Sequence, residues 1–526
     1  MALTWFLTRQ TTRLFLSQTR RSYSALFPSS KRKGLVLGIY TEGSGDSQEF
    51  KLTSTGNKFN QQLGGKLEDL LRLHGSYIPK GEVQVFQNVE SEFYSIAVAG
   101  LGKEDVGFNT LENLDECREN VRVAAGAGAR ALSSLGTSMI SVEGFGQAEA
   151  AAEGAALATW RFQDFKAKED HKSVPHLELF MDADSAGWQR GLLKADAQNL
   201  ARNLCDTPAN IMTPSAFARA AVEALCPCGV GVEVRDKDWI ESKKLNAFLA
   251  VAKGSSEPPI FLELGYCGGQ QDERPIVLVG KGITYDSGGL CLKKCKQMSE
   301  FKGDMAGAAV IVATMKAIAS LTLPINVQAL IPLCENMPSG MSMKPGDILF
   351  AHNGASIQVE DTSNEGRIIL ADALGYAREA HKPRLMIDVA TLSMGMRSAL
   401  GGAASGVYTN NHDLWREINK AGSITGDRVW RFPLWHHFTK KVTYITNADV
   451  TNTGMGPGGS PCRAAAFLKE FVPCGDWVHL DITSCGMECH SADYPYLKMR
   501  RMTGRPTRTL IQFLYQIACP PDPKVK

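Results

Sequence analysis

The chain has 526 residues, of which 44% are hydrophobic and 21% are charged, so it has the composition of an ordinary globular protein long enough for two or more domains. Its formal net charge of +2 gives no electrostatic reason to expect a nucleic-acid partner. The 13 cysteines are an odd number without CxxC pairs, which indicates reduced thiols of an intracellular compartment rather than a disulfide framework.

The first part of the chain, residues 1–31, differs in composition from the rest. Between Met1 and Tyr40 there is no Asp or Glu, whereas arginines and lysines alternate with Trp, Phe and Leu amid Ser and Thr. This basic, amphipathic composition is typical of a mitochondrial transit peptide, so we expect residues 1–31 to direct the chain to the matrix. A basic tail without a targeting role is the alternative. The apolar runs are too short, and too often interrupted by arginine, to span a membrane.

After this leader, the chain has the pattern of a smaller α/β domain, for which we expect the bounds 32–184. Short apolar runs separated by glycines and polar turns predict strands, and stretches rich in Ala and Gly predict helices. The predicted strands cover residues 34–40, 83–86, 94–100 and 177–181, and the predicted helices cover residues 117–135 and 148–160. None of these stretches carries the residues of an active site, so we expect a scaffold or an assembly surface.

A helix-patterned connector follows over residues 185–205, where leucines and alanines recur at helical spacing. Prolines and an asparagine then stop the helix and open a larger C-terminal domain, for which we expect the bounds 206–526.

Strands alternate with helices in this C-terminal domain. The predicted strands cover residues 248–251, 260–264, 276–279, 325–331, 385–389 and 477–482, and the predicted helices include 303–319 and 365–379. Near-continuous apolar strands between helices predict an α/β fold with a mostly parallel sheet buried on both faces. Ligands of such sheets bind at the carboxyl ends of the strands.

Charged residues fall at these strand ends. Lys281 and Asp286 follow the strand 276–279 within a glycine-rich bend, and Asp304 and Glu365 stand at the first turns of the two predicted helices. The helix dipole favours a carboxylate at a first turn, so either acid alone has a structural explanation. Together with a lysine, however, several gathered acids would be costly unless a cation compensated them.

The motifs around these residues resemble those of the leucine aminopeptidase family, the cytosol aminopeptidases. The matching segments are residues 279–289, 304–309, 333–340, 344–347, 365–374 and 501–509. The resemblance covers the catalytic half closely and the N-terminal half only in its general pattern. It implies a smaller N-terminal α/β domain, a C-terminal catalytic domain that removes N-terminal residues from peptides, and a hexamer built as a dimer of trimers.

The resemblance also implies roles for individual residues. The ligands of a tighter metal site would be Lys281, Asp286, Asp304 and Glu365. Lys293 resembles the catalytic lysine that polarises the peptide carbonyl, and Arg367 resembles the catalytic arginine that holds a bicarbonate. The expected substrate pocket contains Phe301, Thr391, Leu392 and Met394. Carboxylates suit Mn²⁺ or Zn²⁺, and Lys281 can act as a ligand only if the metal holds its amine deprotonated.

Ser363 departs from the family at a metal-ligand position. The family's Asn-Thr-Asp-Ala-Glu-Gly-Arg is Asp-Thr-Ser-Asn-Glu-Gly-Arg in residues 361–367 of this chain. The family's four carboxylates balance two dications, whereas the three that remain here leave one positive charge uncompensated. A hydroxyl is a weak ligand for a dication, so the looser metal is expected to bind poorly and the tighter site to stay occupied.

Asp361 is a candidate replacement for the missing carboxylate. Residues two apart in an extended segment point to the same side, so Asp361 would share a face with Ser363 and a modest backbone shift would bring its carboxylate toward the vacant position. The alternative is that Asp361 only occupies the place of a substrate-pocket asparagine.

Other departures from the family fall near the same cleft. Met394 stands where the family usually has Gly, Phe301 and Lys302 replace the commoner Met-Arg pair, and residues 460–463 introduce a proline and Arg463. Neutral drift or altered specificity explains any one of these changes. The changes taken together favour weaker selection for catalytic activity.

Two functional hypotheses follow. The first is a mitochondrial metalloaminopeptidase with one tight metal and reduced or altered activity. The second is a catalytically inactive paralogue with a structural or assembly role, which would resemble the insect sperm leucyl aminopeptidases, degenerate members of the family. In either case the expected assembly is a homohexamer or a mixed hexamer with paralogues.

Overall fold

The computed structural model describes residues 33–43, 49–75, 77–472, 474–491 and 494–520. The expected transit peptide, residues 1–31, therefore lies outside the described residues. The chain divides into two compact units, one of Met1–Glu104 with Asn120–Trp188 and the other of Asp105–Glu119 with Gln189–Lys526.

The segment Asp105–Glu119 belongs to the larger unit, although the sequence-based bounds placed it in the smaller domain. Side chains of the larger unit hold it there. The amide of Asn113 donates to Asn419 across 2.7 Å, and Arg428 forms a 2.8 Å ion pair with Glu112.

The smaller unit is built on a six-stranded sheet whose main path is β3-β4-β1-β7-β8, with β2 paired to β1. Strand β1 runs parallel to β4 and β7, and β7 runs parallel to β8. The strands are β1 (Lys33–Glu42), β2 (Glu49–Leu52), β3 (Val83–Gln87), β4 (Ser95–Gly102), β7 (Met139–Glu143) and β8 (His176–Phe180), and the helices are α2 (Ser54–Gln62), α3 (Lys66–His74), α4 (Glu116–Ser134) and α5 (Ala148–Thr159).

Alternate residues of β1 pack on opposite faces of this sheet, as the period of two in a strand requires. Leu35 and Leu37 join a buried cluster with residues of α2 and α3. On the other face, Val36 contacts Gly128 of α4 so closely that a Cβ atom at position 128 would lie 2.5 Å from a Val36 methyl carbon. The glycine therefore allows α4 to pack against the sheet.

The larger unit is built on a nine-stranded sheet with the main path β18-β17-β20-β16-β11-β13-β10-β9, and β12 pairs with β13. The central strands β13, β11, β16 and β20 run parallel to one another. The flanking strands add antiparallel pairs, β10 with β13 and with β9, and β17 with β20. The strands are β9 (Gly231–Arg235), β10 (Ile260–Cys267), β11 (Ile276–Gly280), β12 (Gly282–Asp286), β13 (Asn326–Asn336), β16 (Leu385–Ala390), β17 (Ser405–Thr409), β18 (Val429–Arg431) and β20 (Asp476–Asp481).

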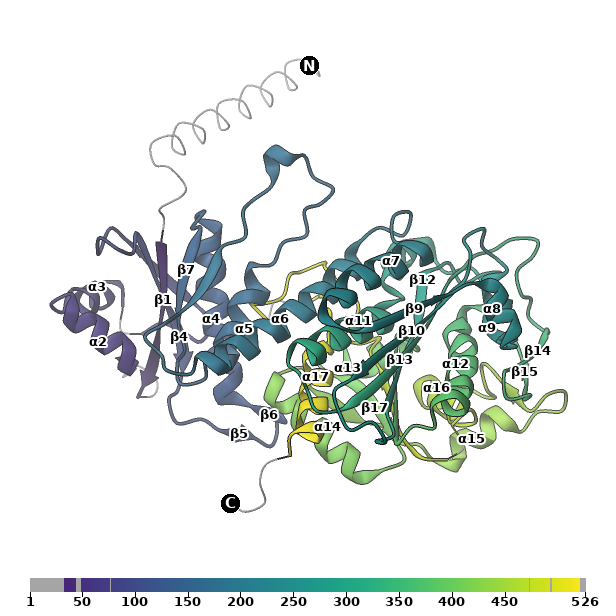
Figure 1. Ribbon diagram of the computed structural model, residues 1–526. Coiled ribbons are helices and arrows are strands. Elements are labelled where there is room, and N and C mark those ends of the chain that lie inside the picture. Colours follow the sequence, from purple (N-terminus) through teal and green to yellow (C-terminus); the bar gives the residue numbers. More distant parts are fainter. Residues whose placement is uncertain (1–32, 44–48, 76, 473, 492–493, 521–526) are drawn as a thin grey trace. The chain divides into compact units, whose positions relative to one another are not determined.

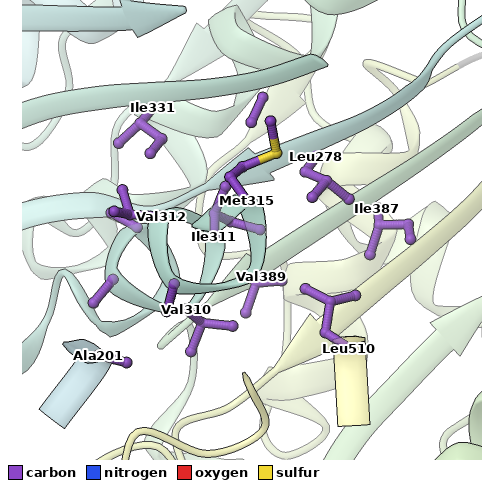
Figure 2. Close-up of a cluster of buried hydrophobic side chains, with 14 of the residues drawn as sticks. Ala201, Leu278, Val310, Ile311, Val312, Met315, Ile331, Ile387, Val389 and Leu510 are labelled. Atoms are coloured by element: carbon purple, nitrogen blue, oxygen red, sulfur yellow. The ribbon is translucent and has the colours of Figure 1, made fainter. Parts of the chain in front are cut away.

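Helices cover both faces of this sheet, which confirms the predicted α/β class. Helix α11 (Ala306–Ser320) is nearly all buried between the sheet and helices α6 and α17, and Figure 2 shows its Val310, Ile311 and Met315 among side chains of the strands. The first face carries α6 (Ser185–Asp206), α7 (Pro214–Leu225), α11, α14 (His412–Thr425) and α17 (Thr507–Ala518). The opposite face carries α8 (Lys237–Ser242), α9 (Asn246–Ala252), α12 (Glu365–His381), α15 (His436–Thr443) and α16 (Ser460–Lys469).

Shorter elements complete the larger unit. They are β5 (Phe108–Asn109), β6 (Leu114–Asp115), α10 (Cys295–Met298), β14 (Ile348–Phe350), β15 (Ser356–Gln358), α13 (Met394–Leu400) and β19 (Val450–Thr451). Among the described residues, one helical stretch, Ser299–Ser320, has the length and hydropathy of a membrane span, and it is the buried core stretch that contains α11.

The predicted strand at 248–251 is wrong, because these residues lie in helix α9. A short continuous apolar run fits a buried helix as well as a buried strand, so periodicity could not separate the two. The helix begins where a carboxylate far along the chain accepts its free amide, since the Phe248 N–H donates to Asp372 Oδ2 across 2.9 Å.

Candidate active site

A cavity of about 350 Å³ opens where β12, β16 and β20 end and where α12 begins. All the residues proposed for the site from the sequence line this cavity except Arg367. This is the carboxyl edge of the parallel strands, where a doubly covered α/β sheet binds its ligands.

Three buried carboxylates converge in this cavity. Asp286 is the last residue of β12, Asp304 follows the 3₁₀ helix Ser299–Gly303, and Glu365 is the first residue of α12. One carboxylate oxygen from each lies within 4.8 Å of the others, and each residue is 1% exposed. Asp304 thus precedes α11 by two residues instead of standing in its first turn, as the sequence had suggested.

Lys281 is the counter-charge of two of these carboxylates. Its Nζ lies 2.7 Å from Asp304 Oδ2 and 2.9 Å from Glu365 Oε1, and it donates to the Thr391 carbonyl across 2.8 Å. Burial alone would lower the pKa of Lys281, but the carboxylates of Asp304, Glu365 and Asp286 outweigh it and raise that pKa. The amine must therefore lose a firmly held proton before it can act as a ligand.

Lys293 is placed beside the third carboxylate. Its Nζ lies 2.7 Å from Asp286 Oδ2 and 4.3 Å from the centre of the Phe301 ring. The pKa of Asp286 is raised to about 8, first by burial and then by repulsion from Glu365 and Asp304. Two lysines thus face three closely spaced carboxyl groups.

The donor set of this cluster fits a divalent cation. Glu365 Oε2 is buried and accepts no hydrogen bond from any described residue, and Asp304 Oδ2 makes only its ion pair with Lys281. Carboxylate oxygens are the ligands that Mn²⁺ and Mg²⁺ favour and that Zn²⁺ also accepts. A dication between the three acids would satisfy the unpartnered oxygens.

Ser363 lies in a 3₁₀ turn, Thr362–Asn364, instead of the extended segment assumed from the sequence. Its hydroxyl donates to Asp361 Oδ1 across 2.7 Å and its amide donates to the same oxygen across 2.8 Å. Both residues line the cavity, but Asp361 does not belong to the close group of three acids that the described chain forms. The Asp361 carboxylate therefore serves as the N-terminal cap of this turn.

Arg367 is a buried cation with free donors. It is 1% exposed, its Nη1 donates to the Asn452 carbonyl across 2.6 Å, and its Nε and Nη2 have no partner in the described part of the chain. Burial and, next, the nearby Arg463 lower the pKa of Arg367 to about 10. Buried unpartnered donors on a guanidinium suit a small oxyanion.

The expected pocket residues come from two segments. The hydroxyl of Thr391 donates to Asp304 Oδ1 across 2.7 Å, and the amide of Leu392 donates to Asp481 Oδ1 across 3.4 Å. Met394 is the first residue of α13 and is 42% exposed, while Phe301 is buried beside Lys293. The segment after β16 is thus bound to the acid cluster and to β20.

Sequence reasoning missed a polar network under the cavity. Fully buried His479 places its Nδ1 2.5 Å from Asp388 Oδ1, and the Trp477 indole donates to Asp388 Oδ2 across 2.7 Å. Burial alone lowers the pKa of His479, but Asp388 outweighs it and raises that pKa. In the same network, the amide of Thr483, a residue of the cavity wall, donates to Asp481 Oδ1 across 3.1 Å. Charged residues inside the apolar runs 385–389 and 477–482 were the available signal.

Asn336 was missed as well. It ends β13, and its side-chain amide donates to Asp286 Oδ1 across 2.8 Å and to the Thr362 carbonyl across 3.1 Å. A polar residue at the end of an apolar strand was the signal that could have found it. Asn336 therefore orients one acid of the cluster.

The comparisons with known proteins cover nearly the whole chain. The model of the cytosol aminopeptidase family catalytic domain matches residues 199–511, and that of the family's N-terminal domain matches residues 36–169. The cytosol aminopeptidase of Bos taurus is 46% identical over 489 residues, which are 92% of this chain and 93% of that protein. The cytosol aminopeptidase of Homo sapiens is 44% identical over 506 residues, which are 96% of each chain.

Solved structures show the same architecture. The bottromycin maturation enzyme BotP is 28% identical and aligns with a TM-score of 0.78, covering 93% of this chain and 99% of its own. The structure of BotP in complex with Mn aligns with a TM-score of 0.79 at 28% identity, covering 93% of this chain and all of its own.

Proposed function

This chain belongs to the cytosol aminopeptidase family, whose members remove N-terminal residues from peptides, and we propose that it is a mitochondrial metalloprotein of this kind with one tight cation site and impaired or altered activity. The observation that carries the proposal is the convergence of Asp286, Asp304 and Glu365, with Glu365 Oε2 buried and without a hydrogen bond from any residue of the described ranges.

The residues that would hold the cation, Mn²⁺ or Zn²⁺, are Lys281, Asp286, Asp304 and Glu365. When bound, the cation supplies Lewis-acid polarisation of the scissile carbonyl. Thr391 keeps Asp304 in place through its 2.7 Å hydrogen bond, and Asn336 does the same for Asp286 across 2.8 Å. The protein therefore holds the acids in one arrangement before a cation or a peptide arrives.

Lys293 is the residue proposed to act on the peptide carbonyl. Its ammonium group lines the cavity and pairs with Asp286 at 2.7 Å, so it faces the space that a peptide end would occupy. A positive charge there stabilises the negative charge that develops on the carbonyl oxygen during attack. Nε and Nη2 of Arg367, which have no partner among the described residues, would hold the bicarbonate that the family resemblance implies.

Ser363 supports the expectation that the second cation binds poorly. The residue is neutral, and its hydroxyl is already donated to Asp361. The second candidate function is that of a catalytically inactive paralogue with a structural or assembly role, such as one in sperm. The neutral residue at the ligand position favours it, and so does the Met394 side chain, which lines the cavity and is 42% exposed. For both candidates we expect a matrix location and a homohexamer or a mixed hexamer.

Release of leucine from a chromogenic amide with added Mn²⁺ tests the proposal, with wild type and Ser363→Asp compared at equal concentration. We expect low activity from the wild type and an increase of at least about tenfold from Ser363→Asp, because the substitution restores a charged ligand. Wild-type turnover that Ser363→Asp leaves unchanged would contradict the single-site proposal. No turnover by either protein would favour the structural candidate.

A further inference from the structure

Arg463 gives the cavity a charge that its other residues do not balance. It stands in the first turns of α16, lines the cavity and is 8% exposed. The other two lining cations, Lys281 and Lys293, are paired with carboxylates at 2.7 to 2.9 Å. Of the lining cations in the described chain, Arg463 alone has no carboxylate oxygen within 4.0 Å. A buried cation without an anion is costly, so the site favours an anionic ligand.

One edge of the Arg463 guanidinium is fixed and the other is free. Its Nη1 donates to the carbonyls of Gly454 and Met455 across 3.1 and 3.2 Å and also to that of Gly456. Its Nε is buried without a partner among the described residues. The side-chain hydrogen bonds that Arg463 makes within the described chain all come from Nη1, so Nη2 makes none there. The group is thus held in one orientation with the Nε and Nη2 pair available, which is the fork that binds a carboxylate through two parallel hydrogen bonds.

A second arginine lies near Arg463. Arg367 lies close enough for the two guanidinium groups to interact, and the acids that act on Arg367 include Asp481 and Asp361. Asp481 is engaged by Thr483 and by Leu392, and Asp361 is engaged by Ser363. Both acids accept these hydrogen bonds through Oδ1, whereas Asp481 Oδ2 has no hydrogen-bond partner among the described residues. Neither acid comes within 4.0 Å of Arg463, so no ion pair within the described chain neutralises it.

We propose that Arg463 binds the side-chain carboxylate of an acidic residue within the first two positions of a peptide, so that this chain selects peptides with acidic N-terminal ends. The inference rests on the proposed function only in taking a peptide N-terminus as the ligand. The cavity of about 350 Å³ is in the size range of a small-molecule site and accommodates a short peptide end. The hydrogen bonds of Nη1 to the loop 454–456 pre-orient the fork and so reduce the entropy lost on binding.

The test measures equilibrium binding, not turnover. Four peptides are titrated into the full chain with Mn²⁺ by calorimetry, namely Glu-Ala-Ala, Gln-Ala-Ala, Ala-Glu-Ala and Ala-Gln-Ala, each N-methylated at the first peptide bond to prevent cleavage. A charge-assisted bidentate pair predicts that one acidic peptide binds about 10- to 100-fold more tightly than its amide counterpart. The acidic peptide with this preference identifies the position that Arg463 reads.

Arg463→Gln is expected to abolish the preference, and Arg463→Lys to keep a weaker one because the charge remains without the fork. Arg416→Gln on α14 is the matched control, since the Arg416 side chain is 69% exposed and its ion pair in the described chain is with Asp413, which is 87% exposed. Thermal melting of each variant shows whether it is folded. If Arg463→Gln weakens acidic and amide peptides equally, Arg463 only ties down the loop and the proposal is overturned.

Two further results separate this inference from the proposed function. If the protein binds the acidic peptide more tightly but releases no residue from the unmethylated peptides, the result supports the role of Arg463 and contradicts peptidase activity. If the protein cleaves the unmethylated peptides but binds acidic and amide peptides with equal affinity, the result supports peptidase activity and overturns the role of Arg463. Displacement of the acidic peptide by millimolar bicarbonate alone would show that an inorganic anion occupies the fork, which also overturns the inference.

Discussion

Ser363 and Asp361 are joined by two hydrogen bonds, because the hydroxyl and the amide of Ser363 both donate to Oδ1 of Asp361, at 2.7 and 2.8 Å. The carboxylate that the sequence offers as a replacement ligand is thus used to cap the turn that carries the serine. This pair of hydrogen bonds argues against compensation by Asp361.

Wild type and Asp361→Ala are expected to bind the same number of Mn²⁺ ions, about one per chain by the single-site proposal, because Asp361 lies outside the group of three close acids. Ser363→Asp is expected to bind a second ion, since it restores an anionic oxygen ligand. Calorimetric titration or the electron paramagnetic resonance of free Mn²⁺ measures this number. A lower stoichiometry for Asp361→Ala than for wild type would show that Asp361 does serve as a ligand.

Lys281→Met is expected to destabilise the metal-free protein by about 3–5 kcal/mol, because it leaves Asp304 and Glu365 buried without their ammonium partner at 2.7 and 2.9 Å. Mn²⁺ should recover part of this loss, since a dication replaces the missing charge. Melting curves with and without Mn²⁺ measure both effects. Lys344→Met is the control, because the Lys344 side chain is 66% exposed. Equal melting of wild type and Lys281→Met would contradict the role of this lysine.

Glu143, the last residue of β7, is expected to make stability depend on pH. Its Oε2 accepts from the Gly38 amide across 3.1 Å, yet burial raises its pKa from 4.5 to about 7. Between these values the folded chain keeps a proton that the unfolded chain has released. The stabilisation is therefore full below about pH 4.5, and the free energy of unfolding decreases as pH rises to about 7.

Glu143→Gln should remove this decrease and raise the free energy of unfolding at pH 8 by roughly 3 kcal/mol. Unfolding measured from pH 4.5 to pH 8 checks the prediction, with the exposed residue changed in Glu92→Gln as the control. Parallel pH curves for wild type and Glu143→Gln would show that this carboxyl group has an ordinary pKa.

Asp372→Ala is expected to lower the free energy of unfolding by about 2–4 kcal/mol. The carboxylate of Asp372 accepts the Phe248 amide at 2.9 Å and the His352 amide at 2.7 Å, so its removal leaves the start of α9 and a neighbouring loop with unpaired donors. Thermal and denaturant unfolding measure the loss, and Asp413→Ala, whose side chain is 87% exposed, is the control. An unchanged melting temperature would show that water replaces both hydrogen bonds.

The features that could be predicted from the sequence are those encoded by residues close together in the chain. Apolar strands followed by Lys281 and Asp286 predicted both the sheet and the edge where charges gather. The failures have non-local causes. Residues 248–251 lie in a helix whose Phe248 amide donates to Asp372, 124 positions later. His479 meets Asp388 only through strand pairing. The hydrogen bond between Ser363 and Asp361 depends on a 3₁₀ turn that alternation along a strand does not describe.

The chain leaves its smaller unit after Glu104, contributes Asp105–Glu119 to the larger one, and re-enters the smaller unit at Asn120. No single peptide-bond cleavage can therefore release either unit whole. During synthesis, the segment Asp105–Glu119, which carries Asn113, is made some 300 residues before Asn419, the hydrogen-bond partner of Asn113. Completion of the larger unit consequently waits for its last third, while an early piece of it is already tethered to the smaller unit.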